Sequence, residues 1–276
     1  GSLERTADGD EPTGLLRERA MELARRVVQQ PGPDALERAI LDAGAANLRL
    51  GITSVWEPSV EPPHIDTYER LEAENRLPIR VTMAQKKVLR SGEAVELARP
   101  FRRPWLSLVG VKLFQDGAIA PRTAALSEPY PGEPENRGLL IWPQEDLDAL
   151  VDEAHRGGFQ VSIHAIGDAA ISSALEAIQR ALARQPDDQR RHRIEHCGLP
   201  LPRVHDLLRR ARIVAVVQPG FLHFHGDGDD IYADVRLADD FERRRVTTAA
   251  EQARLVAEVE AILSFREGGE TGSPPA

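Results

Sequence analysis

The chain has 276 residues, of which 41% are hydrophobic and 29% charged, a composition typical of a folded domain with a substantial core. Its net charge of −9, with acids and bases interspersed, argues against nucleic acid as the main partner. The single cysteine, Cys197, excludes an internal disulfide and fits a reducing compartment, so we expect a cytoplasmic protein. No apolar run of about 18 residues predicts a membrane span, and no signal peptide is visible.

The amino-terminal part predicts a loop and then two helices. Residues 1–14 are polar and contain Pro and Gly, so we expect a loop that leads into the domain. A helical pattern covers residues 15–29 and ends at the Pro-Gly-Pro segment 31–33. A second helix is predicted to follow, with Asp34 as its capping residue.

From residue 51 onward, strands and helices alternate. The predicted strands cover residues 51–55, 79–84, 106–114, 159–165, 193–197 and 213–218. The predicted helices cover residues 65–75, 93–99, 144–155, 168–183 and 204–211, and a long loop covers residues 115–141. This alternation predicts an α/β fold with a parallel sheet. A closed barrel of this kind needs eight strand–helix units, so about six strands predict a partial (β/α)8 barrel.

We assign the partial barrel to residues 15–240. Residues 241–267 are expected to form a terminal helix that diverges from the barrel, with a capping box at Thr248 and Glu251. Residues 268–276 are expected to be disordered.

Three polar side chains interrupt or end apolar strands. Lys112 lies within the strand 106–114, His164 near the end of the strand 159–165, and His196 near the end of the strand 193–197. Because the carboxyl ends of parallel strands form the active-site face of such barrels, these side chains are candidates for one shared site. Imidazoles on neighbouring strands can converge on a zinc ion. The alternative is that each histidine is a hydrogen-bonded core residue and that the lysine faces solvent or an ion-pair partner.

Several sequence blocks, in order along the chain, resemble one known family. They are residues 111–117 (VKLFQDG), 122–126 (RTAAL), 136–138 (NRG), 163–168 (IHAIGD), 192–196 (HRIEH) and 217–219 (VQP). With the segments 8–14 and 50–55 they cover about residues 8–230. These blocks resemble the amidohydrolase superfamily, most closely the family 3 branch that includes N-substituted formamide deformylases.

The resemblance implies a metal-dependent hydrolase that acts on small amide-type substrates, at carbon–nitrogen bonds other than peptide bonds. Such enzymes hold one or two divalent ions, usually zinc, and attack the amide-type carbon with a metal-activated water. His164 and His196 match the metal-binding histidines of the fifth and sixth barrel strands. Lys112 falls at the fourth-strand ligand position, where a carboxylated lysine often bridges two metals. Lys112 could instead be a cation that binds a substrate oxyanion directly.

The sequence also departs from the family pattern. The His-x-His metal pair of the first strand is missing, since His64 is the only histidine before His155. The eighth-strand aspartate, which usually binds metal and accepts a proton, is not found, and the resemblance ends at about Asp234. We therefore keep an alternative function, a truncated and inactive amidohydrolase fragment or a non-catalytic binding subunit. A homo-oligomer or a complementing chain is the expected partner.

Five residues are predicted to contact substrate: Asp116, Arg122, Gln218, His223 and His225. The first two lie in the long loop after the third strand, Gln218 closes the last strand, and the two histidines follow it. A surface ion pair is the alternative for Asp116 and Arg122. No catalytic acid or base is assigned from the sequence.

Three neighbours of these residues are predicted to be structural. Asp168 is expected to cap its helix, although it could instead orient His164. Glu195 is expected to point away from His196, because successive strand side chains alternate between the two faces. Cys197 is expected to be a small core residue.

Overall fold

The computed structural model describes residues 2–6, 8–9, 11–17, 24, 31–88 and 94–218. Six parallel strands form a sheet in the order β3-β4-β6-β7-β8-β9, and the short β5 pairs antiparallel with β6. Their bounds are β3 Ser54–Val60, β4 Arg80–Lys86, β5 Phe101–Arg102, β6 Leu106–Phe114, β7 Gln160–Ala165, β8 Arg193–His196 and β9 Val214–Val216. The predicted partial (β/α)8 barrel of about six parallel strands is therefore confirmed.

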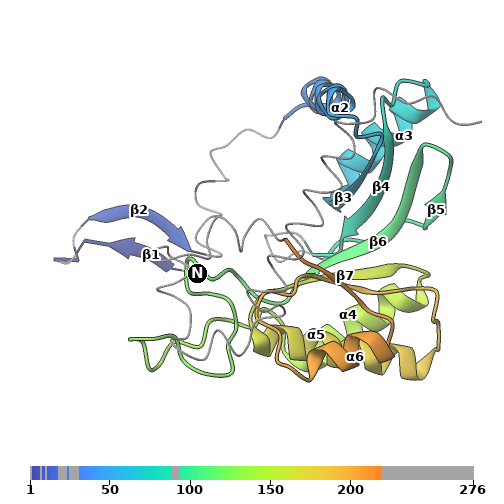
Figure 1. The fold of residues 1–276 in the computed structure, drawn as a ribbon. Helices are drawn as coiled ribbons and strands as arrows, with labels where there is room; N and C mark the ends of the chain where they lie inside the picture. Colours follow the sequence, from blue (N-terminus) through green and yellow to red (C-terminus); the bar gives the residue numbers. More distant parts are fainter. Residues whose placement is uncertain are drawn as a thin grey trace, which may run out of the picture.

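The helices lie along the sheet, as Figure 1 shows. Helices α2 (Pro33–Arg49) and α3 (Pro62–Ala73) lie near β3 and β4, whereas α4 (Gln144–Arg156), α5 (Asp168–Arg184) and α6 (Val204–Arg210) lie together near β7. Within the described residues, no helix is both long and apolar enough to cross a membrane.

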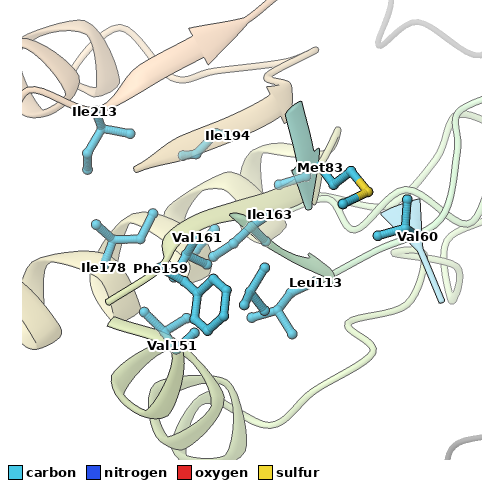
Figure 2. Packing of buried hydrophobic residues seen from close by; sticks show 14 of the residues in the cluster. Val60, Met83, Leu113, Val151, Phe159, Val161, Ile163, Ile178, Ile194 and Ile213 are labelled. Carbon is cyan, nitrogen blue, oxygen red and sulfur yellow. The ribbon is translucent and has the colours of Figure 1, made fainter. Parts of the chain in front are cut away.

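The hydrophobic core lies between the sheet and the helices. In β7, Val161 and Ile163 are fully buried, and Figure 2 shows them beside Val151 of α4 and Ile178 of α5. Helix α5 buries Ile171, Leu175 and Ile178, which repeat every three to four residues and so form one apolar face. Burying each such side chain contributes about 1.5–3 kcal/mol. This packing fixes the strands whose carboxyl ends carry the polar residues.

The loop predicted over residues 1–14 is wrong for most of that segment. The segments Ser2–Arg5 (β1) and Pro12–Arg17 (β2) form a two-stranded antiparallel hairpin. Its turn uses Gly9 at φ 80°, a left-handed conformation that glycine adopts at little cost. The helix predicted from residue 15 therefore cannot include residues 15–17, which belong to β2. Gly and Pro in this segment indicate turns, but the strands that flank the turn are too short and polar to show a pattern.

Two further local predictions need correction. Residues 95–100 have no regular secondary structure where a helix was predicted over 93–99, and the short β5 that follows pairs with β6. Strands β5 and β6 form a short hairpin, whose turn is closed by a hydrogen bond from the Arg103 N–H to the Leu106 carbonyl. No sequence pattern predicts this contact. Helix α2 begins at Pro33 after Gly32, without a side-chain cap, because proline already has a helical φ and lacks the N–H that a cap would bind. Asp34 lies in the first turn.

The predicted terminal helix over 241–267 and the predicted tail over 268–276 lie outside the described residues.

Candidate metal centre

A left-handed turn of the backbone at the end of β8 places His196 on the same face of the sheet as His164 of β7. His196 and Cys197 have φ angles of 72° and 45°, in the left-handed region that costs a residue with a side chain about 1–3 kcal/mol. The His196 ring meets the His164 ring of β7 edge-on, with ring centroids 4.6 Å apart. The Cys197 N–H donates to the Ala165 carbonyl at 3.1 Å and helps to hold this turn of the backbone.

Glu195 shares this face, contrary to the prediction from strand alternation. Its carboxylate accepts a hydrogen bond from the Ser162 hydroxyl at 2.6 Å and one from Arg193 Nε at 2.8 Å. Ser162 is in register with Lys112 on the neighbouring strand, so Glu195 faces the same side of the sheet as Lys112. The prediction failed because the left-handed backbone begins at His196, after which alternation no longer holds.

Lys112 is buried beside the two histidines. Its Nζ lies 4.8 Å from the centroid of the Phe114 ring, and that ring lies 5.4 Å from the His164 ring. Burial lowers the pKa of Lys112 to about 8, while the nearby Glu195 carboxylate opposes this shift and Arg193 adds to it. No carboxylate within the described ranges lies at salt-bridge distance from Lys112. The structure therefore brings Lys112, His164 and His196 together on one face.

A hydrogen bond to an oxygen acceptor fixes the tautomer of each of the two histidines. His164 Nε2 lies 2.8 Å from the Gly117 carbonyl, so this nitrogen carries the hydrogen and Nδ1 carries the lone pair. His196 Nδ1 lies 2.7 Å from Gln218 Oε1, so in this ring Nε2 carries the lone pair. The Gln218 amide is itself oriented, because its Nε2 donates to the Val216 carbonyl at 3.0 Å.

The pKa values of both rings favour the neutral form that a metal requires. Burial lowers the pKa of His164 to about 4, although the hydrogen bond to Gly117 opposes the shift. Burial also lowers the pKa of His196, against the effect of its bond to Gln218. Both imidazoles are therefore uncharged at neutral pH, with defined tautomers.

Asp116 lies beneath His164 and holds backbone groups. Its side chain is 0% exposed, and its carboxylate accepts N–H bonds from Ala125 at 3.0 Å, Ile166 at 3.0 Å and Gly167 at 2.8 Å. Its Oδ1 also lies 3.4 Å from His164 Nε2. The structure therefore places Asp116 where it joins the long loop to the end of β7 and supports the Gly117–His164 contact, away from any surface that could meet a substrate.

Two further side chains near this loop have partners within the chain. Arg122 forms an ion pair with Glu133, which is the alternative considered for it. Asp168 does not cap α5, because Gly167 is the N-cap residue, and its carboxylate instead accepts the Ser127 N–H at 2.9 Å. Gly167 has no side chain for a steric reason, since a Cβ there would lie 1.9 Å from the Ala125 carbonyl oxygen.

The described residues bring together the three side chains that were predicted to bind metal. Two neutral imidazoles fit the nitrogen ligands of a divalent ion, but a catalytic zinc normally has at least three protein ligands and a structural one four. Across the described ranges, no group of three His, Cys, Asp or Glu side chains is placed to hold a metal. The predicted substrate contacts His223 and His225 lie outside these ranges, and Gln218 contacts His196.

Comparison with known proteins gives a consistent picture. A match to the amidohydrolase family covers residues 1–254, which extends beyond the point near Asp234 where the motifs ended. The chain is 31% identical over 248 residues to protein LONG AFTER FAR-RED 3 of Arabidopsis thaliana, covering 84% of this chain and 41% of that protein. It is 30% identical over 231 residues to the putative amidohydrolase YtcJ of Bacillus subtilis (strain 168), covering 80% of this chain and 42% of that protein.

A solved structure has the same arrangement. An uncharacterized metal-dependent hydrolase from Pyrococcus furiosus superposes with a TM-score of 0.69 at 28% identity, covering 88% of this chain and 50% of that one. The chain thus spans about half the length, or less, of the relatives it matches.

Proposed function

Because this chain belongs to the amidohydrolase family, we propose that it contributes the metal-binding half of a hydrolase that acts on carbon–nitrogen bonds other than peptide bonds. The proposed substrates are small amide-type molecules such as N-formyl and N-acyl compounds. The proposed cofactor is a divalent ion, with zinc favoured because two of the candidate ligands are imidazoles. A reducing, cytoplasmic compartment is proposed on the basis of the lone free thiol of Cys197.

The observation that carries this proposal is the pair of neutral histidines with fixed tautomers. A metal-binding histidine usually donates its second ring N–H to an oxygen acceptor, which fixes the tautomer and the ring orientation. His164 does so to the Gly117 carbonyl and His196 to the Gln218 amide. When bound, a divalent ion would supply Lewis acidity, which lowers the pKa of water and provides a nucleophile at neutral pH.

Lys112 has one of two proposed roles beside this pair. Its lowered pKa increases the fraction of neutral amine, which is the form that reacts with carbon dioxide to give a carboxylated lysine. That group would add an oxygen ligand for the ion. An uncarboxylated lysine would instead be a buried cation that stabilises negative charge on the substrate oxygen.

A second candidate function is a non-catalytic subunit or an inactive fragment. The observation that favours it is the small ligand set, because within the described ranges only two imidazoles and Lys112 converge. We propose that a second copy or a complementing chain supplies further ligands and pairs with the exposed edges of the sheet. The two functions differ in whether a complete set of ligands forms.

The first experiment measures metal content. The full chain is incubated with zinc, freed of unbound metal and assayed by elemental analysis, beside a His164→Ala/His196→Ala variant and a His64→Ala/His205→Ala control. We expect the site variant to lose the bound zinc and the control, which removes two histidines from elsewhere in the fold, to retain it. Equal zinc in all three proteins would show that the two histidines do not form the site.

The second experiment separates the enzyme from the binding subunit. Hydrolysis of N-formyl and N-acyl amino acids is measured with added zinc, for the chain alone and for the chain mixed with a fragment that carries the missing barrel strands of a relative. Turnover that appears with the fragment and is lost in the His196→Ala variant supports the hydrolase. Zinc binding without turnover in either mixture supports the non-catalytic alternative.

A further inference from the structure

A second region that could bind a ligand lies at the opposite ends of the same strands. A cavity of about 550 Å³ is lined by Gln160, Arg193 and Val214, the first residues of β7, β8 and β9, and by Arg102 of β5. Because these are the amino ends of the strands, the cavity is separate from the carboxyl-end face that carries His164, and His164 is not among its lining residues. Its volume is in the range of sites that hold small molecules.

The lining of this cavity is strongly basic. It contains four arginines, Arg102, Arg190, Arg191 and Arg193, and a single acid, Asp187. This concentration of positive charge is notable in a chain whose net charge is −9. Asp187 is already paired with Arg190, at 2.6 Å from its Nη2. The side chains of Arg102 and Arg191 have no hydrogen bond or ion pair with any other described residue.

The loop that presents two of these arginines is held rigidly. Gln160 Nε2 donates to the carbonyls of Arg190 and Arg191, at 3.2 and 2.6 Å. Asp187 Oδ1 accepts the N–H groups of Gln189 and Arg190, both at 3.0 Å. These bonds hold Arg191 at a left-handed φ of 48°. The backbone that carries the guanidinium groups is therefore ordered before a ligand arrives, which lowers the entropy cost of binding.

Arg193, which also lines the cavity, is held by two contacts. Its Nε donates to Glu195 at 2.8 Å, and its guanidinium carbon lies 4.4 Å from the centroid of the Trp56 ring. This leaves the group oriented by an ion pair on one side and by an aromatic face on the other.

We propose that this cavity binds a small molecule that carries a phosphate group. A phosphate monoester has a charge of about −1.5 to −2 at neutral pH, which matches the two arginines that lack a carboxylate partner. The planar guanidinium group donates paired hydrogen bonds that suit phosphate oxygens. A monocarboxylate would compensate only one of the two charges. The size of the cavity leaves room for an organic group attached to the phosphate.

The test is isothermal titration of the full chain with inorganic phosphate and with glycerol 2-phosphate, each against sodium chloride of equal ionic strength. The site variant is Arg102→Gln/Arg191→Gln. The control is Arg156→Gln/Arg209→Gln, which removes the same charge from exposed helical arginines on α4 and α6. Circular dichroism checks that both variants fold as the parent does.

We expect saturable binding of both phosphates, at least tenfold weaker in the site variant and unchanged in the control. Tighter binding of glycerol 2-phosphate would identify a phosphorylated small molecule as the ligand, and equal binding would identify the phosphate group alone. Absence of saturable binding, equal binding of chloride, or equal weakening in both variants would overturn the proposal.

Discussion

Two pairs of histidines lie at the two ends of the same strands, and both are largely buried. At the carboxyl ends of β7 and β8, His164 and His196 meet with ring centroids 4.6 Å apart. Near the amino ends, His155 at the end of α4 and His192 just before β8 meet with centroids 5.0 Å apart. The pairs have similar edge-on geometry, yet their hydrogen bonds differ in a way that separates a structural pair from a ligand pair.

The amino-end pair uses every ring nitrogen. The Val161 N–H donates to His192 Nδ1 at 2.9 Å, so His192 Nε2 carries the hydrogen and donates to His155 Nδ1 at 3.0 Å. His155 Nε2 then donates to the Gln185 carbonyl at 2.7 Å. This chain of bonds starts at a backbone donor, ends at a backbone acceptor and leaves no lone pair for a metal.

The carboxyl-end pair has a different pattern. The rings of His164 and His196 each donate to a separate oxygen acceptor, the Gly117 carbonyl and the side-chain oxygen of Gln218. The two rings therefore carry their hydrogens on opposite nitrogens, Nε2 in His164 and Nδ1 in His196. Burial is common to both pairs, so the direction of the hydrogen bonds is the better guide to a ligand histidine.

The largest expected effect concerns the support beneath the carboxyl-end pair. Replacing Asp116 by Ala removes a buried carboxylate that accepts three backbone N–H groups, so we expect the free energy of unfolding to fall by about 4 kcal/mol. Urea denaturation followed by circular dichroism measures this. Asp66→Ala on the exposed side of α3 is the control and should change stability by less than about 0.5 kcal/mol. A small loss for Asp116→Ala would mean that the loop is held by other contacts.

The next effect tests the amino-end pair directly. His192→Leu leaves the buried Val161 N–H without an acceptor and His155 Nδ1 without a donor, so we expect a loss of about 3 kcal/mol. His164→Leu should cost less than half as much, because only the bond to the Gly117 carbonyl is lost. Similar losses for the two variants would break the distinction between the pairs.

The amino-end pair also predicts a pH dependence. Burial, together with His155 and Arg190, lowers the pKa of His192 from 6.5 to about 3, while Asp187 opposes the shift. A histidine that stays neutral in the fold but is protonated when unfolded stabilises the protein above the unfolded pKa, and this stability is lost as pH falls from about 6.5 towards 3. We expect His192 alone to lower the free energy of unfolding by about 2 kcal/mol between pH 7.5 and pH 5, in addition to the effect of the buried His164. In the His192→Leu variant the difference between the two pH values should be smaller by about 2 kcal/mol; an unchanged pH dependence would assign it to other groups.

The smallest effect concerns the orientation of a ligand. Gln218→Ala removes the acceptor that fixes the tautomer of His196, and such outer contacts change metal affinity by about 10- to 100-fold. We expect zinc affinity to fall about tenfold, measured by competition with a fluorescent chelator, with little change in stability. Gln189→Ala, at an exposed amide on the loop before β8, is the control. Unchanged zinc affinity in Gln218→Ala would show that His196 needs no partner to bind.

The strands and the three polar residues at their ends were predictable because apolar runs mark buried strands regardless of their neighbours. Five of the six predicted strands agree with the structure to within two residues at each end, whereas the strand predicted over 51–55 is β3 at Ser54–Val60. Lys112, His164 and His196 share one face. Glu195 was misplaced because the left-handed turn at His196 is made by residues other than glycine and so leaves no trace in the sequence. The hairpin β1–β2 and the two-residue β5 are too short for periodicity to show.

Tertiary contacts explain the other differences. Asp116 follows β6 directly and looks like a substrate contact in the sequence, but its partners lie nine to 51 residues further along the chain. The bond between His155 and His192 likewise joins residues 37 apart and depends on how α4 packs against the sheet. No local pattern encodes such pairings.

The backbone turn at His196 and Cys197 contains a buried thiol, so local opening of this turn can be measured by chemical labelling of Cys197. Cys197 is the only thiol of the chain, is 2% exposed, and has a pKa that burial raises to about 12. A thiol reagent at pH 8 therefore reacts only with molecules in which the end of β8 has opened. The labelling rate reports the frequency of that opening without any engineered probe. An ion held between His164 and His196 would slow the reaction, and so the same cysteine measures how strongly ligand binding rigidifies the site.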